Sequence, residues 1–133
     1  VVDQPVNVSG VVAYYPPLDL RTPKKTYNKK MNVAIGELLG APAEKTKKKA
    51  ALASPMAHVD KDDPPVLLLH GEADEWVPIE ESRTFAKLLK KAGVPHYVYE
   101  PVGAAGKHGF PLLSTKQVER SCTTWEFLKA VTK

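Results

Sequence analysis

The sequence is poor in cysteine, in aromatic residues and in long apolar stretches, and these shortages exclude several classes of protein. Cys122 is the one cysteine among 133 residues, which excludes an internal disulfide and a cysteine-rich metal site. No apolar run approaches the ~20 residues that a membrane-spanning helix needs, so we expect no membrane span. With 43% hydrophobic and 26% charged residues, the composition is that of a folded domain rather than a disordered or fibrous chain.

The net charge of +4 raises the hypothesis of nucleic-acid binding, but the distribution of the lysines argues against it. They lie in short runs, Lys24-Lys25, Lys29-Lys30 and Lys47–Lys49, without aromatic residues between them that could stack on bases. Acidic residues interrupt the positive field, among them Asp60 and the glutamates from Glu72 to Glu81. We therefore expect solvated helix faces and loops, and no nucleic-acid partner.

Three apolar segments predict the strands of a parallel sheet. Val8–Tyr14 is rich in β-branched residues, Pro65–His70 is an uninterrupted apolar run, and His96–Val102 alternates more, as a strand near a sheet edge does. Helical patterns separate these segments, and strands that alternate with helices form a parallel sheet through right-handed crossovers. The predicted fold class is α/β, with about three parallel strands and flanking helices, which is half of a doubly wound sheet.

Helical patterns between the strands cover residues 31–39, about 42–53 and about 78–92. Gly40 and Gly93 are the predicted C-terminal stops of the first and third helices. Glu80 and Glu81 fall in the first turn of the third helix, where negative charge complements the helix dipole.

The last helix is predicted to begin with a capping box formed by Ser114 and Gln117. We expect Cys122 to be a buried, inert thiol on the apolar face of this helix. The predicted inward stripe consists of Val118, Cys122, Trp125, Leu128 and Val131.

Two polar loops follow the second and third predicted strands, and catalytic groups of open α/β sheets gather at such carboxyl ends. The first loop runs from His70 to Pro78 and contains Asp74, and the second runs from Gly106 to Phe110 and contains His108. A carboxylate on one loop can fix the tautomer of an imidazole on the other, so that the second ring nitrogen faces a nucleophile. The spacing alone leaves this pairing a hypothesis.

Two other interpretations of the first loop stay open on the residues alone. Glu72 and Glu75 flank Asp74 and are alternative acids. A metal site from His70, Glu72, Asp74 and His108 is conceivable, but no pair of these ligands has helical metal-site spacing, so we expect no metal.

The run Ser54-Pro55…Pro64-Pro65-Val66-Leu67-Leu68-Leu69-His70-Gly71-x-x-Asp74-x-x-Val77-Pro78…Ser82 resembles the acid loop of α/β-hydrolases. The later run Gly106-Lys107-His108-Gly109-Phe110 resembles the histidine loop of that family, and Val11–Leu20 resembles the strand and pocket-lining loop after its nucleophile helix. The best likeness is to bacterial esterases and lipases of the acetyl-esterase and feruloyl-esterase-like branch. Prolyl-oligopeptidase-type peptidases are similar over the same stretch.

This resemblance implies a carboxylic-ester hydrolase with a Ser-Asp-His triad and no cofactor, in which Asp74 is the acid and His108 the base. It implies substrate contacts for Trp76, which otherwise covers the sheet end, and for Asp19, which otherwise caps backbone N–H groups. His70 is implied to pack under the acid loop. The implied substrate is a small-molecule ester such as an acetylated or feruloylated carbohydrate. A serine peptidase of the prolyl-oligopeptidase type and a catalytically inert fragment with an association role are the alternatives.

The sequence departs from the family pattern because the nucleophile elbow Gly-x-Ser-x-Gly is absent, as is the His-Gly-Gly-Gly oxyanion loop. None of the serines lies between two glycines at that spacing; they are Ser9, Ser54, Ser82, Ser114 and Ser121. In the family both motifs precede the equivalent of Val8. We therefore expect residues 1–133 to form a partial α/β-hydrolase domain whose nucleophile-bearing N-terminal half is absent. That half is the expected partner, with self-association through Val8–Tyr14 as a second expectation.

Overall fold

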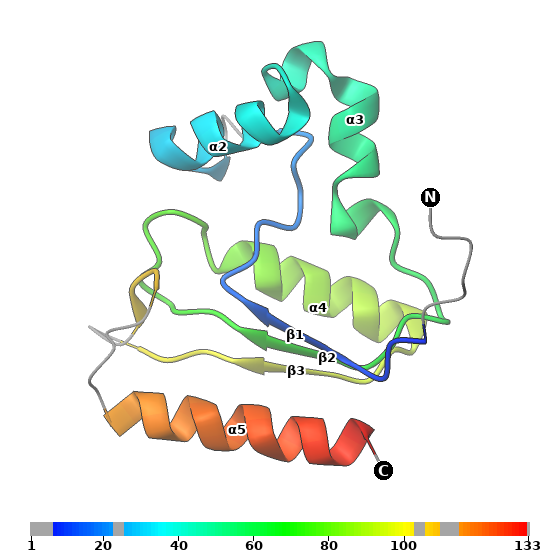
Figure 1. Ribbon diagram of the computed structural model, residues 1–133, viewed down its shortest axis with the longest axis vertical. Coiled ribbons are helices and arrows are strands. Elements are labelled where there is room, and N and C mark those ends of the chain that lie inside the picture. The colour runs from blue at the N-terminus through cyan, green and yellow to red at the C-terminus, as the bar shows by residue number, and fades with distance from the viewer. Residues whose placement is uncertain (1–6, 23–25, 103–105, 110–114, 133) are drawn as a thin grey trace.

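The computed structural model describes residues 7–22, 26–102, 106–109 and 115–132, and it contains a parallel three-stranded sheet between helices (Figure 1). The strands are β1 (Val11–Tyr14), β2 (Val66–Leu69) and β3 (His96–Tyr99), in the order β1-β2-β3. Both neighbouring pairs are parallel, which confirms the predicted α/β class with three parallel strands and flanking helices. Each strand is shorter than its apolar segment.

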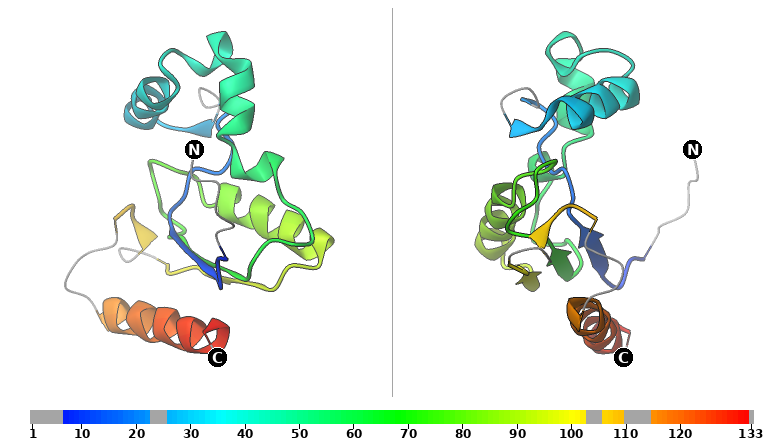
Figure 2. Two further views of the ribbon diagram at one scale, coloured as in Figure 1. Left: turned by 45° about the vertical axis from the view of Figure 1, so that its right-hand side comes forward. Right: turned by 90° about the vertical axis from the view of Figure 1, so that its left-hand side faces the viewer.

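Helices cover both faces of the sheet. The helix α4 (Glu80–Ala92) lies along one face, and α5 (Thr115–Val131) lies along the other. The helices α2 (Lys29–Leu39) and α3 (Lys47–Leu52) form a further layer, far from α5 in every view (Figure 2).

The central strand β2 is buried along its whole length, which explains its uninterrupted apolar sequence. Leu68 packs with Phe85 and Leu89 of α4, whereas Leu67 and Leu69 point to the opposite face. The edge strand β1 is only half-covered, and Val11 and Tyr14 are 38% and 42% exposed. The sheet is therefore well packed at β2 and open at β1.

The helix α2 has the predicted stop, because Gly40 adopts the left-handed conformation at φ 80°. The predicted helix over residues 42–53 is wrong as a continuous element. A 3-10 turn, Ala43–Lys45, precedes α3, and the chain breaks between them at Thr46, whose φ is −125°. The Thr46 hydroxyl donates to the Pro42 carbonyl oxygen at 3.2 Å, a local side-chain bond of the kind that competes with helix continuation.

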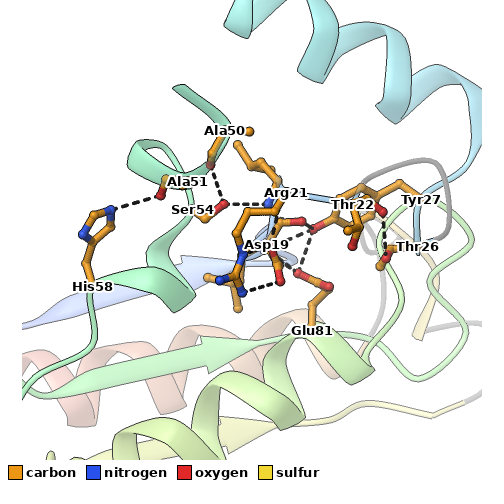
Figure 3. A network of polar contacts seen from close by, with 12 residues as sticks. Asp19, Arg21, Thr22, Thr26, Tyr27, Ala50, Ala51, Ser54, His58 and Glu81 are labelled. Carbon is orange, nitrogen blue, oxygen red and sulfur yellow. Dashed lines mark hydrogen bonds and ion pairs between the residues drawn. The ribbon is translucent and has the colours of Figure 1, made fainter. Parts of the chain in front are cut away.

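The first turn of α4 contains Glu80 and Glu81 as predicted, but Glu81 points into the protein (Figure 3). Its Oε2 accepts hydrogen bonds from the backbone N–H groups of Leu18 and Asp19 at 2.9 and 2.8 Å. The Tyr27 hydroxyl donates to the same oxygen at 2.7 Å. This carboxylate therefore ties the segment after β1 to α4.

The helix α5 turns a different stripe toward the sheet from the predicted one. Phe127 packs on Leu67 and Leu69, and its ring lies so close to Gly10 that a Cβ atom there would sit 3.2 Å from it. Two tyrosines orient the helix further: the Tyr14 and Thr124 hydroxyls share a hydrogen bond, and the Tyr99 hydroxyl donates to Glu119. This packing rotates the predicted stripe away from the sheet.

The expectation of a buried Cys122 is consequently wrong, because its side chain is exposed. Trp125 and Leu128 are also exposed, at 61% and 38%, and Val131 alone of the predicted stripe is shown half-buried near Gly10. Ser114 and the Val118 side chain fall outside the described residues.

Candidate active site

The acid loop follows β2 at the carboxyl end of the sheet, and hydrogen bonds to its own backbone shape it. Asp74 Oδ1 accepts from the N–H groups of Trp76 and Val77 at 2.8 and 2.9 Å. The loop that carries His108 touches it backbone to backbone, because Ala73 N–H donates to the Gly106 carbonyl oxygen at 3.0 Å. A Cβ atom on Gly71 would overlap the Gly106 backbone, so this approach requires glycine.

Asp74 and His108 meet across these two loops, as expected from the sheet order. The Oδ2 atom of Asp74 lies 2.7 Å from Nδ1 of His108. The Asp74 side chain is fully buried, and that of His108 is 20% exposed. Because a carboxylate only accepts hydrogen bonds, Nδ1 carries the proton and Nε2 keeps its lone pair for a reaction partner. The alternative acids Glu72 and Glu75 are both exposed.

His70 lies fully buried beneath the acid loop, in the position that the family resemblance implies. Its Nε2 faces the Val77 carbonyl oxygen at 2.8 Å, so this nitrogen carries the hydrogen, and Nδ1 accepts from the Ser82 hydroxyl at 2.7 Å. Burial lowers the pKa of His70 from its ordinary value, which keeps the ring neutral. The 3.5 Å separation between His70 Nε2 and Asp74 Oδ2 is therefore no ion pair.

Two aromatic rings contact the imidazole of His108. The Trp76 indole stacks on it, with centroids 4.9 Å apart and an angle of 6° between the planes. The Tyr15 ring lies at 4.5 Å with a tilt of 55°. A third residue, Lys30 of α2, places its Nζ 5.4 Å from the centroid of the Trp76 ring.

Tyr15 belongs to the segment Val11–Leu20 that resembles a pocket-lining loop, but the sequence pattern did not single it out as a neighbour of His108. It directly follows β1, and its φ of 40° is the only positive φ of a non-glycine residue among those described. A residue before proline favours extended backbone, so the sequence Tyr15-Pro16 predicts a different conformation. The sequence feature that could have identified Tyr15 is its position directly after the first predicted strand, at the same carboxyl edge of the sheet as Asp74 and His108.

The carboxylate of Asp19 is engaged by a neighbour (Figure 3). Arg21 donates from Nε to Oδ1 and from Nη2 to Oδ2, both at 2.7 Å, and its backbone N–H donates to Oδ1 at 3.0 Å. The side-chain hydrogen bond from Arg21 lowers the pKa of Asp19 below its ordinary value. These contacts match the capping interpretation, and a substrate contact of Asp19 stays a prediction.

A small cavity of about 130 Å³ lies beside the pair, lined by Ala73, Glu75, Trp76, Lys107 and His108. Larger hollows lie along α2, beside β1 and between the sheet and α5. Over the residues that the structure describes, no three His, Cys, Asp or Glu side chains are grouped as a metal site would need. No helix in those ranges has the length and apolarity to cross a membrane.

Comparison with known proteins gives this geometry a context. A family model described as BD-FAE matches residues 2–89, a stretch that contains Asp74 and ends before His108. The chain is 40% identical to Esterase LipQ of Mycobacterium tuberculosis over 63 residues. That match covers 47% of this chain and 15% of LipQ, so the chain spans a small part of this curated relative.

Solved structures resemble the chain over most of its length. A truncated carbohydrate esterase from gut microbiota superposes with a TM-score of 0.72 at 27% identity, covering 95% of this chain and 44% of that one. A puromycin-hydrolyzing peptidase of Mycobacterium tuberculosis superposes with a TM-score of 0.63 at 27% identity, covering 76% of this chain and 15% of the other. These similarities agree with the fold of α/β-hydrolase esterases.

Proposed function

Because the chain belongs to the BD-FAE family, we propose that it is the acid- and base-bearing part of a carboxylic-ester hydrolase. The observation that carries this proposal is the 2.7 Å contact between Asp74 Oδ2 and His108 Nδ1 at the carboxyl end of the sheet. The similarity to esterases supports ester hydrolysis as the reaction class.

In this mechanism a serine from outside the 133 residues attacks the ester carbonyl carbon. Nε2 of His108 takes the serine proton and then returns it to the leaving alcohol. Asp74 holds the imidazole in the required tautomer and stabilises the imidazolium that forms. Backbone N–H groups near the serine hold the oxyanion, and no cofactor takes part.

We propose that the nucleophile-bearing half of the same protein joins the sheet at β1. Two features of the structure support this position. The outer side of β1 is half-exposed and apolar, which makes it a template for another strand. Beside it lies an apolar cavity of about 350 Å³. Its lining includes Val11, Ala13, Pro17, Leu18, Val66 and Phe85.

The proposed substrate is a small-molecule ester, such as an acetylated or feruloylated carbohydrate. The similarity to a carbohydrate esterase supports this substrate class. Trp76 borders the cavity next to His108 and is 38% exposed, and both features support a substrate contact for it. Asp19 is the weaker candidate because Arg21 already engages its carboxylate.

A serine peptidase is the second candidate function, favoured by the similarity to the puromycin-hydrolyzing peptidase. The two functions differ in the bond that is cleaved, so turnover of matched ester and amide substrates separates them. A catalytically inert fragment that only associates with a partner is the third possibility, and it predicts no turnover in any assembly.

The test uses the full-length protein, meaning this chain joined to its nucleophile-bearing half, with a short p-nitrophenyl ester. Asp74→Asn and His108→Ala should each lower kcat by about 10³-fold or more with little change in folding, because each removes a triad function. His58→Ala is the matched control, since His58 is exposed and bonds to the carbonyl groups of Ala51 and Leu52 instead. Wild-type turnover by His108→Ala would exclude the base role.

A further inference from the structure

A single hydrogen bond does not define the orientation of the His108 ring. The Cβ–Cγ bond tethers the ring and the bond from Nδ1 to Asp74 Oδ2 fixes one ring atom, but small changes of χ1 and χ2 still tilt the ring while this bond is kept. A general base must keep Nε2 in line with its reaction partner, because small errors of position slow proton transfer strongly. A contact with the face of the ring limits this tilt.

The Trp76 indole has the geometry for this task. Its plane is within 6° of the imidazole plane, so a tilt of the imidazole would weaken the stack. The same carboxylate contacts both residues: Asp74 Oδ2 accepts from the His108 ring, and Oδ1 accepts from the backbone N–H of Trp76 at 2.8 Å. The acid, the base and the stacked ring form one closed set of contacts.

Two residues from other elements complete this set. Lys30 of α2 lies over the indole at 5.4 Å, a cation–π distance that holds the Trp76 ring. Tyr15 contacts the imidazole from the end of β1, and its backbone has the left-handed φ of 40°. Such strain persists where the surrounding structure enforces it, and it is common at functional sites.

We propose that Trp76 is a positioning residue for the base, and that its ring, together with Tyr15, fixes the imidazole plane of His108 so that Nε2 stays directed at the nucleophile. This inference rests on the proposed function, and it differs from a substrate contact of Trp76. A substrate contact acts on binding, whereas a positioning residue acts on the chemical step through His108.

The first test is kinetic and uses the full-length protein with a short p-nitrophenyl ester. Trp76→Ala should lower kcat roughly ten- to a hundredfold, in addition to any rise in KM from a lost substrate contact, because the base is misplaced. Trp76→Phe, which keeps a ring that can stack, should recover most of this loss. A raised KM with unchanged kcat in Trp76→Ala would overturn the proposal in favour of a substrate contact.

A double variant asks whether Trp76 acts through His108. Adding Trp76→Ala to His108→Ala should cause no further loss of kcat, because the positioned group is already gone. A further loss of tenfold or more would overturn the proposal. Trp125→Ala is the matched control, since the Trp125 ring lies on α5 and contacts Lys129, and it should leave kcat unchanged.

The second test needs no activity. An aromatic ring stacked in parallel shifts the NMR signals of the ring protons beneath it upfield. The carbon-bound ring protons of His108 should therefore move downfield in Trp76→Ala, stay nearly in place in Trp76→Phe, and be unaffected by Trp125→Ala. Unmoved signals in Trp76→Ala would overturn the inference. If the His108 signals move in Trp76→Ala but the wild-type protein hydrolyses no ester, the result would support the stack and refute the proposed function.

Discussion

The buried imidazole of His70 connects the end of the acid loop to the first turn of α4, because it bridges the Val77 carbonyl oxygen and the Ser82 hydroxyl. Both partners are fully buried, so neither can turn to water if the ring is lost. In the proposed mechanism His70 takes no part in the chemistry, but it supports the loop that carries Asp74.

This arrangement predicts a pH-dependent stability. The pKa of His70 is below its ordinary value of 6.5, mainly because of burial, so the unfolded chain binds a proton at a pH where the folded chain does not. The contribution is fully present above pH 6.5 and is lost as the pH falls from there through the lowered pKa. Urea unfolding between pH 8 and pH 5 should therefore show a free energy of unfolding that declines below pH 6.5.

Two variants separate His70 from the other titrating groups. His70→Gln keeps an N–H donor for the Val77 carbonyl oxygen but cannot titrate, so it should flatten this decline. His58→Gln should keep it, because His58 is exposed. The lowered pKa of Asp19 acts in the same direction, but only below its ordinary value of 3.8, well outside this window. An unchanged slope in His70→Gln would contradict the assignment.

Residue types at strand ends made the contact between Asp74 and His108 a hypothesis, and the family resemblance made it an expectation. They were not enough for Tyr15, whose φ of 40° depends on tertiary packing. They also missed Glu81, because a glutamate in the first turn of a helix normally faces water and complements the dipole. The capping interpretation of Asp19 was available from the sequence, since the partner Arg21 lies two residues away.

At the scale of elements, the junction between the segment after β1 and α4 combines a buried carboxylate network with apolar packing, because Leu18 lies in the same buried cluster as Phe85 and Leu89. Glu81 accepts from two backbone N–H groups and from the Tyr27 hydroxyl, and α2 begins two residues after Tyr27. Burial and the hydrogen bond to Glu81 raise the pKa of Tyr27 well above its ordinary value, so the hydroxyl remains a donor.

Removing the Glu81 carboxylate should therefore destabilise the folded protein. Glu81→Ala should lower the free energy of unfolding by about 2–4 kcal/mol, because it leaves buried N–H groups without an acceptor. Glu80→Ala is the matched control in the same helical turn, where the side chain is 69% exposed and bonds only to Arg83 at 3.3 Å. Its cost should be about 0.5 kcal/mol or less. Urea denaturation of both variants measures the difference, and equal losses would contradict the buried role of Glu81.

The ends of helices could be predicted from the sequence where a single local feature, such as a glycine after the last turn, determines them. Gly40 and Gly93 end their helices in the left-handed conformation as predicted. The orientation of α5 could not be predicted from its apolar spacing. Phe127 can approach the sheet because Gly10 has no side chain, and that contact joins residues far apart in the sequence.

At the scale of the whole molecule, the 133 residues contain the proposed acid and the proposed base but neither a nucleophile elbow nor an oxyanion loop. The isolated chain should therefore show no ester turnover above a histidine background, since even residual activity of triad variants comes from the oxyanion hole and substrate binding. A p-nitrophenyl ester assay with free histidine as reference tests this. Clear turnover by the isolated chain would contradict the division of the triad between two halves.

Because the open side of β1 can pair with another strand, we predict self-association or poor solubility for the isolated chain. Val11→Lys places a charge on this strand and should shift the chain toward monomer in sedimentation velocity. Val33→Lys is the matched control, because Val33 is 54% exposed on α2, away from the sheet edge. A monomeric wild-type chain with a two-state melt would contradict the predicted role of this edge.

The glycine contact between the two loops has a consequence for how tightly the site is built. Gly71 and Gly106 meet main chain to main chain, with no side chain between these two residues. At this point the spacing of the loops is therefore set by main-chain packing and by hydrogen bonds such as that from Ala73 N–H to the Gly106 carbonyl oxygen, rather than by side chains that change rotamer. The two loops therefore have little freedom to move relative to each other. Warming should increase the motion of surface side chains and other loops before it changes the distance from Asp74 to His108.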